Sequence, residues 1–129
     1  MFTKIIILSL GGAIGTVLRY GLSGAVHNLT RGVFPYGTLT VNLVGCLVIG
    51  LLWGTFERFA FSPQLRLFVF VGVLGGFTTF SSFGLETFGL LRDGELRLGL
   101  WNMLLSNVFG IALVYLGFVL SRYIIGWVK

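Results

Sequence analysis

The stretch GGFTTFSSF, residues 75–83, interrupts a long apolar segment that runs from about residue 65 to residue 91. Two glycines, two threonines and two serines in nine residues are a poor composition for a plain membrane-spanning helix. A helix can break at the glycines, and the hydroxyl groups can satisfy the backbone groups that the break frees. The stretch therefore predicts a broken helix, a feature that forms ion sites at the middle of a membrane.

The composition predicts an all-α integral membrane protein. Hydrophobic residues make up 56% of the 129 residues and charged residues 10%, which leaves too little polar surface for a water-soluble globule. Four apolar segments, at residues 5–26, 36–56, 65–91 and 98–125, each reach the ~20 residues that cross a bilayer core. We expect a single transmembrane domain over residues 1–129, with four transmembrane helices and a break in the third.

The basic side chains lie at the ends of the predicted spans, so the net charge of +5 indicates contact with lipid phosphates and no nucleic-acid partner. Five basic residues are expected on the same side of the membrane as the N-terminus: Lys4, Arg58, Arg66, Arg122 and Lys129. Four are expected on the opposite side: Arg19, Arg31, Arg92 and Arg97. This near balance gives almost no preferred orientation under the positive-inside rule. We expect the chain to insert into the membrane in both orientations and to form an antiparallel homodimer. The alternative is that a weak charge bias in so short a chain says nothing about orientation.

The sequence offers no constellation for catalysis, so no enzyme is expected. Cys46 is the single cysteine and His27 the single histidine, which predicts neither a disulfide framework nor a metal-ligand cluster. We expect Cys46 to serve in packing and His27 to lie in a polar loop. Three pairs with G-x-x-x-G spacing predict close helix packing: Gly11 and Gly15, Gly50 and Gly54, Gly72 and Gly76.

Two spans carry narrow tracks of uncharged polar residues. Thr38 and Asn42 share one face of the second span, and Asn102, Ser106 and Gly110 repeat the same spacing in the fourth. Their N–H and O–H donors suit an anion better than a cation. Hydrogen bonding that only holds the helices together is the alternative explanation.

Glu86 is the only carboxylate expected at membrane depth. A proton-coupled exporter of cations would need such a titratable group. We favour an ion pair with Arg19, which lies near the same side of the membrane.

Phe80 and Phe83 are three residues apart, so one helical face presents both rings. The edge of a phenyl ring carries the positive part of its quadrupole and can face an anion. The alternative is that both are ordinary core residues among thirteen phenylalanines.

The chain resembles the Fluc family of small bacterial and archaeal fluoride channels. The resemblance covers the whole length and rests on GTLTVNLVG in the second span, GGFTTFSSF followed by Glu86 in the third, and Arg19 late in the first. It implies an antiparallel, dual-topology homodimer with two fluoride pathways. It also implies a structural sodium ion at the dimer centre, held by the backbone carbonyls of Gly75 and Thr78.

The same resemblance implies roles for individual side chains. To the fluoride pathway it assigns Asn42, Phe80, Phe83, Thr38, Thr79, Ser82, Ser106 and Asn102, and to the ends of the pathway Arg19 and Glu86. Two positions depart from the family pattern: Asn102 stands where other members can carry a tyrosine, and Gly110 where some carry a serine. These departures alter the polar track of the fourth span.

The expected function is a fluoride-selective channel in a bacterial inner membrane or archaeal plasma membrane, through which cytoplasmic fluoride leaves passively. Its expected partners are fluoride, the bilayer and a second copy of the chain. A small multidrug-type, proton-coupled exporter is one alternative, but it should carry a carboxylate early in the first span, and residues 5–26 contain none. A non-transporting membrane scaffold is the other, but it gives no reason for a broken third helix.

Overall fold

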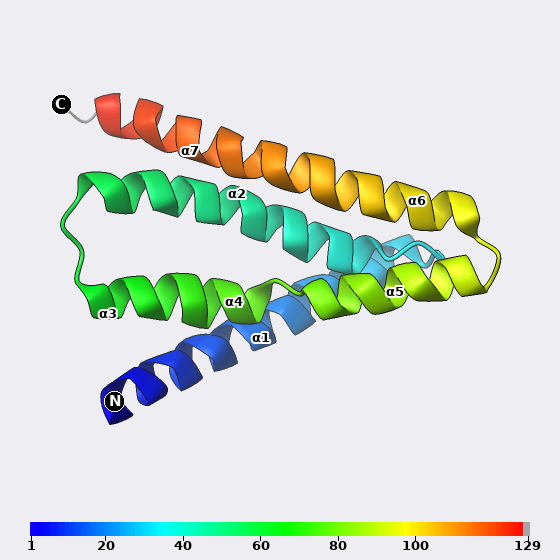
Figure 1. The fold of residues 1–129 in the computed structure, drawn as a ribbon, viewed down its shortest axis with the longest axis horizontal. Helices are drawn as coiled ribbons and strands as arrows, with labels where there is room; N and C mark the ends of the chain where they lie inside the picture. Colours follow the sequence, from blue (N-terminus) through cyan, green and yellow to red (C-terminus); the bar gives the residue numbers. More distant parts are fainter. Residues whose placement is uncertain (128–129) are drawn as a thin grey trace.

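The computed structural model describes residues 1–127, which contain helices and short connections only (Figure 1). The first two spans are α1 (Phe2–Thr30) and α2 (Tyr36–Arg58). The third comprises α3 (Pro63–Arg66), the π-helical segment η1 (Leu67–Val73), α4 (Leu74–Phe77) and α5 (Phe80–Arg92). The fourth comprises α6 (Leu96–Leu104), the π-helical segment η2 (Leu105–Phe109) and α7 (Gly110–Trp127). All four spans are long and apolar enough to cross a membrane, which confirms the predicted class.

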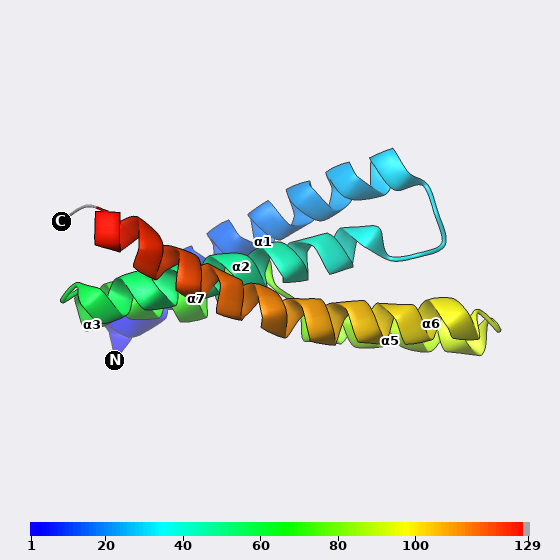
Figure 2. The same ribbon diagram turned by 90° about the horizontal axis from the view of Figure 1, so that it is seen from above.

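The four spans run up and down through the bundle. The start of α1, the end of α7 and the α2–α3 connection lie at one end, and the α1–α2 and α5–α6 connections lie at the other (Figures 1 and 2). Helix α2 packs along α7, while α1 crosses η1 and α4 at an angle. The helix break between α4 and α5 lies near the middle of the bundle (Figure 1).

Glycines form the two tightest helix contacts, as the G-x-x-x-G spacing predicts. On α1, a Cβ at Gly11 would lie 2.9 Å from the Cα of Gly72, and a Cβ at Gly15 would overlap the Val73 carbonyl. On α2, a Cβ at Gly50 would overlap the Val114 carbonyl of α7. The pairs therefore let backbones meet within one subunit.

Substituting Gly15 with alanine should destabilise the bundle by about 1–3 kcal/mol, because the new methyl group has to displace backbone of η1 and α4. Gly12→Ala is the matched control on the same helix, since a Cβ there meets no atom within 4 Å. Denaturant titration of both variants in micelles measures the difference. Equal stability of the two would contradict the tight crossing.

The third helix is broken at Thr78 and Thr79, which confirms the prediction from GGFTTFSSF. Thr78 has φ −86° and ψ 159°, and Thr79 has φ −150° and ψ 117°, so both are extended. The Thr78 hydroxyl donates at 2.9 Å to the Leu74 carbonyl, which also accepts from the Thr78 amide at 3.0 Å. The glycines precede the break, and the threonines form it.

The placement of His27 in a loop is wrong. His27 is exposed in the last turn of α1, which continues to Thr30 because no proline or glycine interrupts residues 27–30. The helix ends only at Arg31, whose φ of 43° is left-handed. The two π-helical segments were also not expected, because their residues are as apolar as those of the neighbouring α-helices.

Candidate functional site

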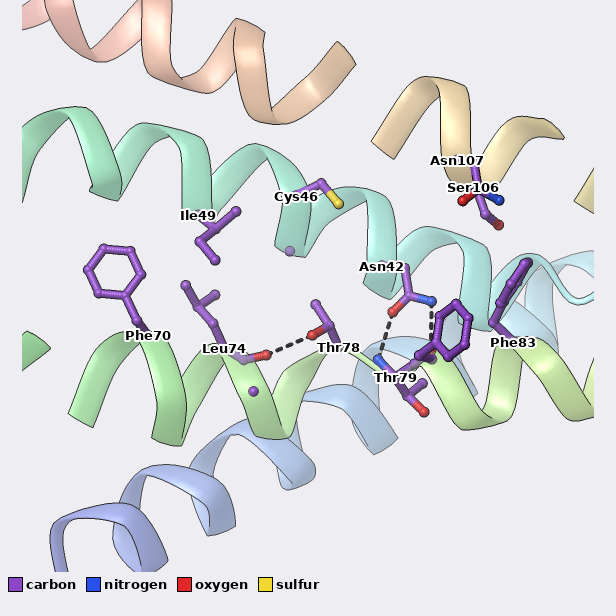
Figure 3. Close-up of a pocket in the computed structure, with 13 residues that line it drawn as sticks. Asn42, Cys46, Ile49, Phe70, Leu74, Thr78, Thr79, Phe83, Ser106 and Asn107 are labelled. Atoms are coloured by element: carbon purple, nitrogen blue, oxygen red, sulfur yellow. Dashed lines mark hydrogen bonds between the residues drawn. The ribbon is translucent and has the colours of Figure 1, made fainter. Parts of the chain in front are cut away.

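The side chain of Asn42 bridges α2 to the broken backbone. Its Nδ2 donates to the Thr79 carbonyl at 2.9 Å, and its Oδ1 accepts from the Thr79 amide at 2.8 Å (Figure 3). The amide thus replaces hydrogen bonds that the break removes. A carboxamide has two N–H donors, so one remains for another acceptor.

The break exposes the N-terminus of α5. Thr79 caps this helix: its Oγ1 accepts from the Ser82 amide at 3.2 Å and donates to the Ser82 hydroxyl at 3.0 Å. The first amides of a helix lack intrahelical partners and lie at the positive end of its dipole. The start of α5 therefore favours an anion.

A cavity of about 400 Å³, here called the central cavity, opens beside the break (Figure 3). Its lining includes Asn42, Cys46, Gly75, Thr78, Thr79, Phe80, Phe83, Ser106 and Asn107. Segments α2, α4, α5 and η2 all contribute to this lining. The fold thus brings five of the predicted pathway residues and both predicted sodium ligands to one place. Cys46, expected only to pack, also lines it.

Phe80 and Phe83 lie against each other at the start of α5. Their ring centroids are 5.5 Å apart and the planes are inclined by 47°. The side chain of Phe80 is 81% exposed within a single subunit, and that of Phe83 is half-buried. Phe80 therefore lies outside the core of the single subunit.

Segment η2 brings the fourth span to the central cavity. The hydroxyl oxygen of Ser106 is buried and has no hydrogen-bond partner among the described residues. Asn107 donates from Nδ2 to the Met103 carbonyl at 2.7 Å and keeps its second N–H donor. Asn107 was not among the predicted site residues; its position directly after Ser106 was the available signal. π-helical turns occur frequently at functional sites, as here.

A second cavity of about 740 Å³, here called the end cavity, includes Arg19, His27, Thr38, Thr79, Ser82 and Glu86 in its lining. Thr79 lines both cavities, so the two lie on either side of the helix break. The end cavity gathers the remaining predicted pathway hydroxyls and both predicted end residues.

Glu86 does not form the expected ion pair with Arg19. The only salt bridge among residues 1–127 joins Arg92 to Asp93. Glu86 Oε1 instead accepts from the Thr38 hydroxyl at 2.6 Å, and Oε2 is buried without a partner in the described chain. The hydrogen-bond donor to Glu86 is thus Thr38 of α2, a pairing that the linear sequence did not reveal.

Asn102 lies outside the lining of both cavities. It is 1% exposed and donates from Nδ2 to the Thr87 hydroxyl at 2.9 Å, and Thr87 donates to the Phe83 carbonyl at 2.7 Å. Asn102 thus joins α6 to the turn of α5 that carries Phe83. Its assignment to the fluoride pathway stays a prediction.

The break leaves backbone carbonyls outside the helical ladder. The Thr79 amide bonds to Asn42 and not to the Gly75 carbonyl, and no backbone amide of residues 1–127 donates to the Thr78 carbonyl. Gly75 is exposed. These are neutral oxygens of the kind that hard cations prefer.

Comparison with known proteins places the chain. The family described as "CrcB-like protein, Camphor Resistance (CrcB)" matches residues 6–118. A Parabacteroides distasonis protein named "Fluoride-specific ion channel FluC" is 44% identical over 126 residues, 98% of each chain. Proteins of that name from Desulforapulum autotrophicum and Magnetococcus marinus are 47% and 48% identical, covering 94% and 91% of this chain and 98% and 96% of their own. This chain belongs to the CrcB-like family.

Proposed function

We infer that this protein is a fluoride-selective ion channel and not an enzyme. The observation that carries the inference is the pair of hydrogen bonds that joins Asn42 to Thr79 at the break in the third helix. Amide, hydroxyl and phenyl groups line the central cavity beside this break. Relatives that align over nearly the whole chain are named fluoride-specific ion channels. Both the geometry and the relatives support anion conduction.

The chemistry of the lining suits fluoride. A small anion is strongly hydrated, and losing that water costs several kcal/mol unless donors replace it. Asn42, Asn107 and Ser106 supply N–H and O–H donors, and Phe80 and Phe83 supply ring edges. Among residues 1–127, no lysine or arginine lines the central cavity, so its sites can be weak enough for an ion to leave, as conduction requires.

The proposed channel is an antiparallel homodimer with two pathways. The central cavity lies at mid-bundle and opens at the surface of the single subunit, where lipid would leave its polar backbone unsatisfied. A second copy would cover it, and the exposed Phe80 would then contact the partner. The nearly balanced basic residues support the antiparallel arrangement.

Topology reporters fused to the C-terminus should signal on both sides of the membrane, because neither end of the bundle has a clear excess of basic residues. Adding two lysines to the N-terminal end of the chain should shift nearly all copies to one orientation. A wild-type chain that already inserts in a single orientation would overturn the dual-topology arrangement.

A structural sodium ion at the dimer centre is part of the same proposal. The Gly75 and Thr78 carbonyls are neutral oxygens outside the helical hydrogen-bond ladder. The first half of the third span ends beside them with α4, and the C-terminal end of a helix is the negative end of its dipole. Two such pairs from two subunits would offer four oxygen ligands, which suits a hard cation better than a transition metal.

Family membership and the four apolar spans make this a multi-pass membrane protein. We place it in the cell membrane, either a bacterial inner membrane or an archaeal plasma membrane. Hydrogen fluoride enters from acidic surroundings and dissociates at neutral cytoplasmic pH, so a passive channel lets the trapped anion leave.

The two alternatives have less support. A multidrug-type exporter needs a carboxylate early in the first span, and the only carboxylate in either of the two cavities is Glu86 of α5. A scaffold subunit has no need of a broken helix with a buried, unpartnered Ser106 hydroxyl beside it.

Fluoride efflux from liposomes that contain the purified protein tests the function. We expect rapid fluoride efflux and little chloride efflux when valinomycin carries the balancing potassium. Equal rates for the two anions would contradict selectivity. No efflux of either anion from correctly assembled protein would contradict the channel itself.

A further inference from the structure

Two neighbouring cavities lie between α2 and α7, at the end of the bundle where α2 and α7 end. The first, here called the arginine cavity, has a volume of about 320 Å³ and is lined by Gly54, Glu57, Arg58, Arg122 and Ile125. The second, here called the apolar groove, has a volume of about 430 Å³ and includes Trp53, Glu57, Ile111, Val114, Tyr115 and Phe118. Glu57 lines both, so the polar cavity and the apolar groove are neighbours.

The arginine cavity contains two guanidinium groups, those of Arg58 and Arg122. Neither Arg58 nor Arg122 forms an ion pair with a carboxylate of residues 1–127. The Arg122 guanidinium lies 5.4 Å from the centroid of the Phe118 ring, a cation–π contact that orients it at the junction with the groove. Two guanidinium groups at a membrane surface form a suitable site for a phosphate group.

Glu57 adds a negative charge to the same cavity. Its Oε1 accepts a hydrogen bond from Trp53 Nε1 at 2.8 Å, which holds the carboxylate in place and leaves Oε2 for another donor. The polar end of the site therefore carries two positive charges and one oriented negative charge. A ligand that joins a phosphate to an ammonium group is complementary to this set.

The apolar groove lies deeper in the membrane than the arginines. Arg58 ends α2, and Trp53 lies five residues earlier, which corresponds to about 7 Å along the helix axis. Val114 of α7 lies eight residues before Arg122, or about 12 Å. The groove thus extends from the two arginines toward the middle of the bundle, the direction that an acyl chain would take from a headgroup held by them.

We propose that each subunit binds one phospholipid with an amine headgroup, such as phosphatidylethanolamine. Arg58 and Arg122 hold its phosphate, Glu57 accepts from its ammonium group, and one acyl chain fills the apolar groove. The site shares no lining residue with the central or end cavity, so it is independent of the proposed fluoride pathway. An antiparallel dimer would carry one such lipid at each membrane face.

Native mass spectrometry of the purified full-length protein, with defined lipids added to the micelles, tests the proposal. The probes are phosphatidylethanolamine, phosphatidylglycerol with the same acyl chains, and inorganic phosphate. We expect phosphatidylethanolamine to be retained best and inorganic phosphate not to be retained. The double variant Arg58→Gln, Arg122→Gln should weaken lipid retention about tenfold, since it removes the charged hydrogen-bond donors.

Arg97→Gln is the matched control, because Arg97 is exposed at the opposite end of the bundle and lines neither part of the site. Glu57→Gln should abolish the preference for phosphatidylethanolamine over phosphatidylglycerol while lipid is still bound. Val114→Trp should fill the groove and lower retention with both arginines in place, which provides a second test if the double variant does not fold.

Three results would overturn the proposal. Unchanged retention by the folded double variant and by Val114→Trp would show that lipid binds elsewhere. Retention of inorganic phosphate as strong as that of lipid would indicate a site for free anions. Loss of dimer, without loss of lipid, in the groove-filling variant would indicate that a second copy of the chain covers the groove.

Discussion

Replacing Asn42 with alanine is expected to lower fluoride flux per assembled dimer by at least about tenfold, because hydrogen bonds to charged groups are worth ~1.5–3 kcal/mol. The change removes the spare N–H donor of the central cavity. It also leaves the Thr79 amide and carbonyl without their partners, each at a cost of about 1–3 kcal/mol. Flux and the free energy of unfolding should therefore fall together.

Asn42→Asp tests the need for an N–H donor. It keeps an oxygen that can accept from the Thr79 amide, but it removes both N–H donors and sets a carboxylate oxygen against the Thr79 carbonyl. We expect flux as low as in Asn42→Ala and a loss of stability at least as large, because an unpaired charge faces another acceptor. Thr55→Ala is the matched control on α2, because the Thr55 hydroxyl bonds within its own helix at 2.8 Å and lines neither cavity of the pathway. Wild-type flux per dimer in Asn42→Ala would exclude Asn42 from the pathway.

The double variant Phe80→Ile, Phe83→Ile is expected to reduce fluoride flux by about tenfold and to leave the dimer folded. The reduction follows if each lost aromatic interaction with the anion is worth ~0.5–1.5 kcal/mol. Isoleucine keeps much of the apolar bulk but has no ring edge for an anion. The exposure of Phe80 in the single subunit means that the intramolecular core loses little. Efflux assays beside size-exclusion profiles measure both quantities.

Phe88→Ile is the control for this pair. Phe88 lies on the same helix, is 58% exposed and lines neither the central nor the end cavity, so its substitution should leave flux unchanged. If both phenylalanines served only in packing, the double variant would lose assembled dimer, and the fluoride flux per remaining dimer would be unchanged. Full flux from the folded double variant would remove the ring-edge mechanism.

Much of the candidate site could be predicted because its chemistry lies in short local motifs. GGFTTFSSF predicted the helix break, and Asn42 and Ser106 were singled out as polar residues in apolar spans. Three features could not be predicted this way. Asn107 faces the central cavity through a π-helical turn, Glu86 bonds to Thr38 in place of Arg19, and Asn102 pairs with Thr87 away from both cavities.

The sequence by itself determined the class of this protein, its four spans and the position of the break, since hydropathy, span length and glycine content act locally along the chain. Only the tertiary structure decided which polar groups meet. Asn42 and Thr79 are 37 residues apart, and their pairing depends on α2 lying beside the break. That proximity depends on Gly45 of α2, where a Cβ would overlap the Thr78 methyl group at the break. Contacts between segments set the distances between donors, and those distances are not encoded in any one segment.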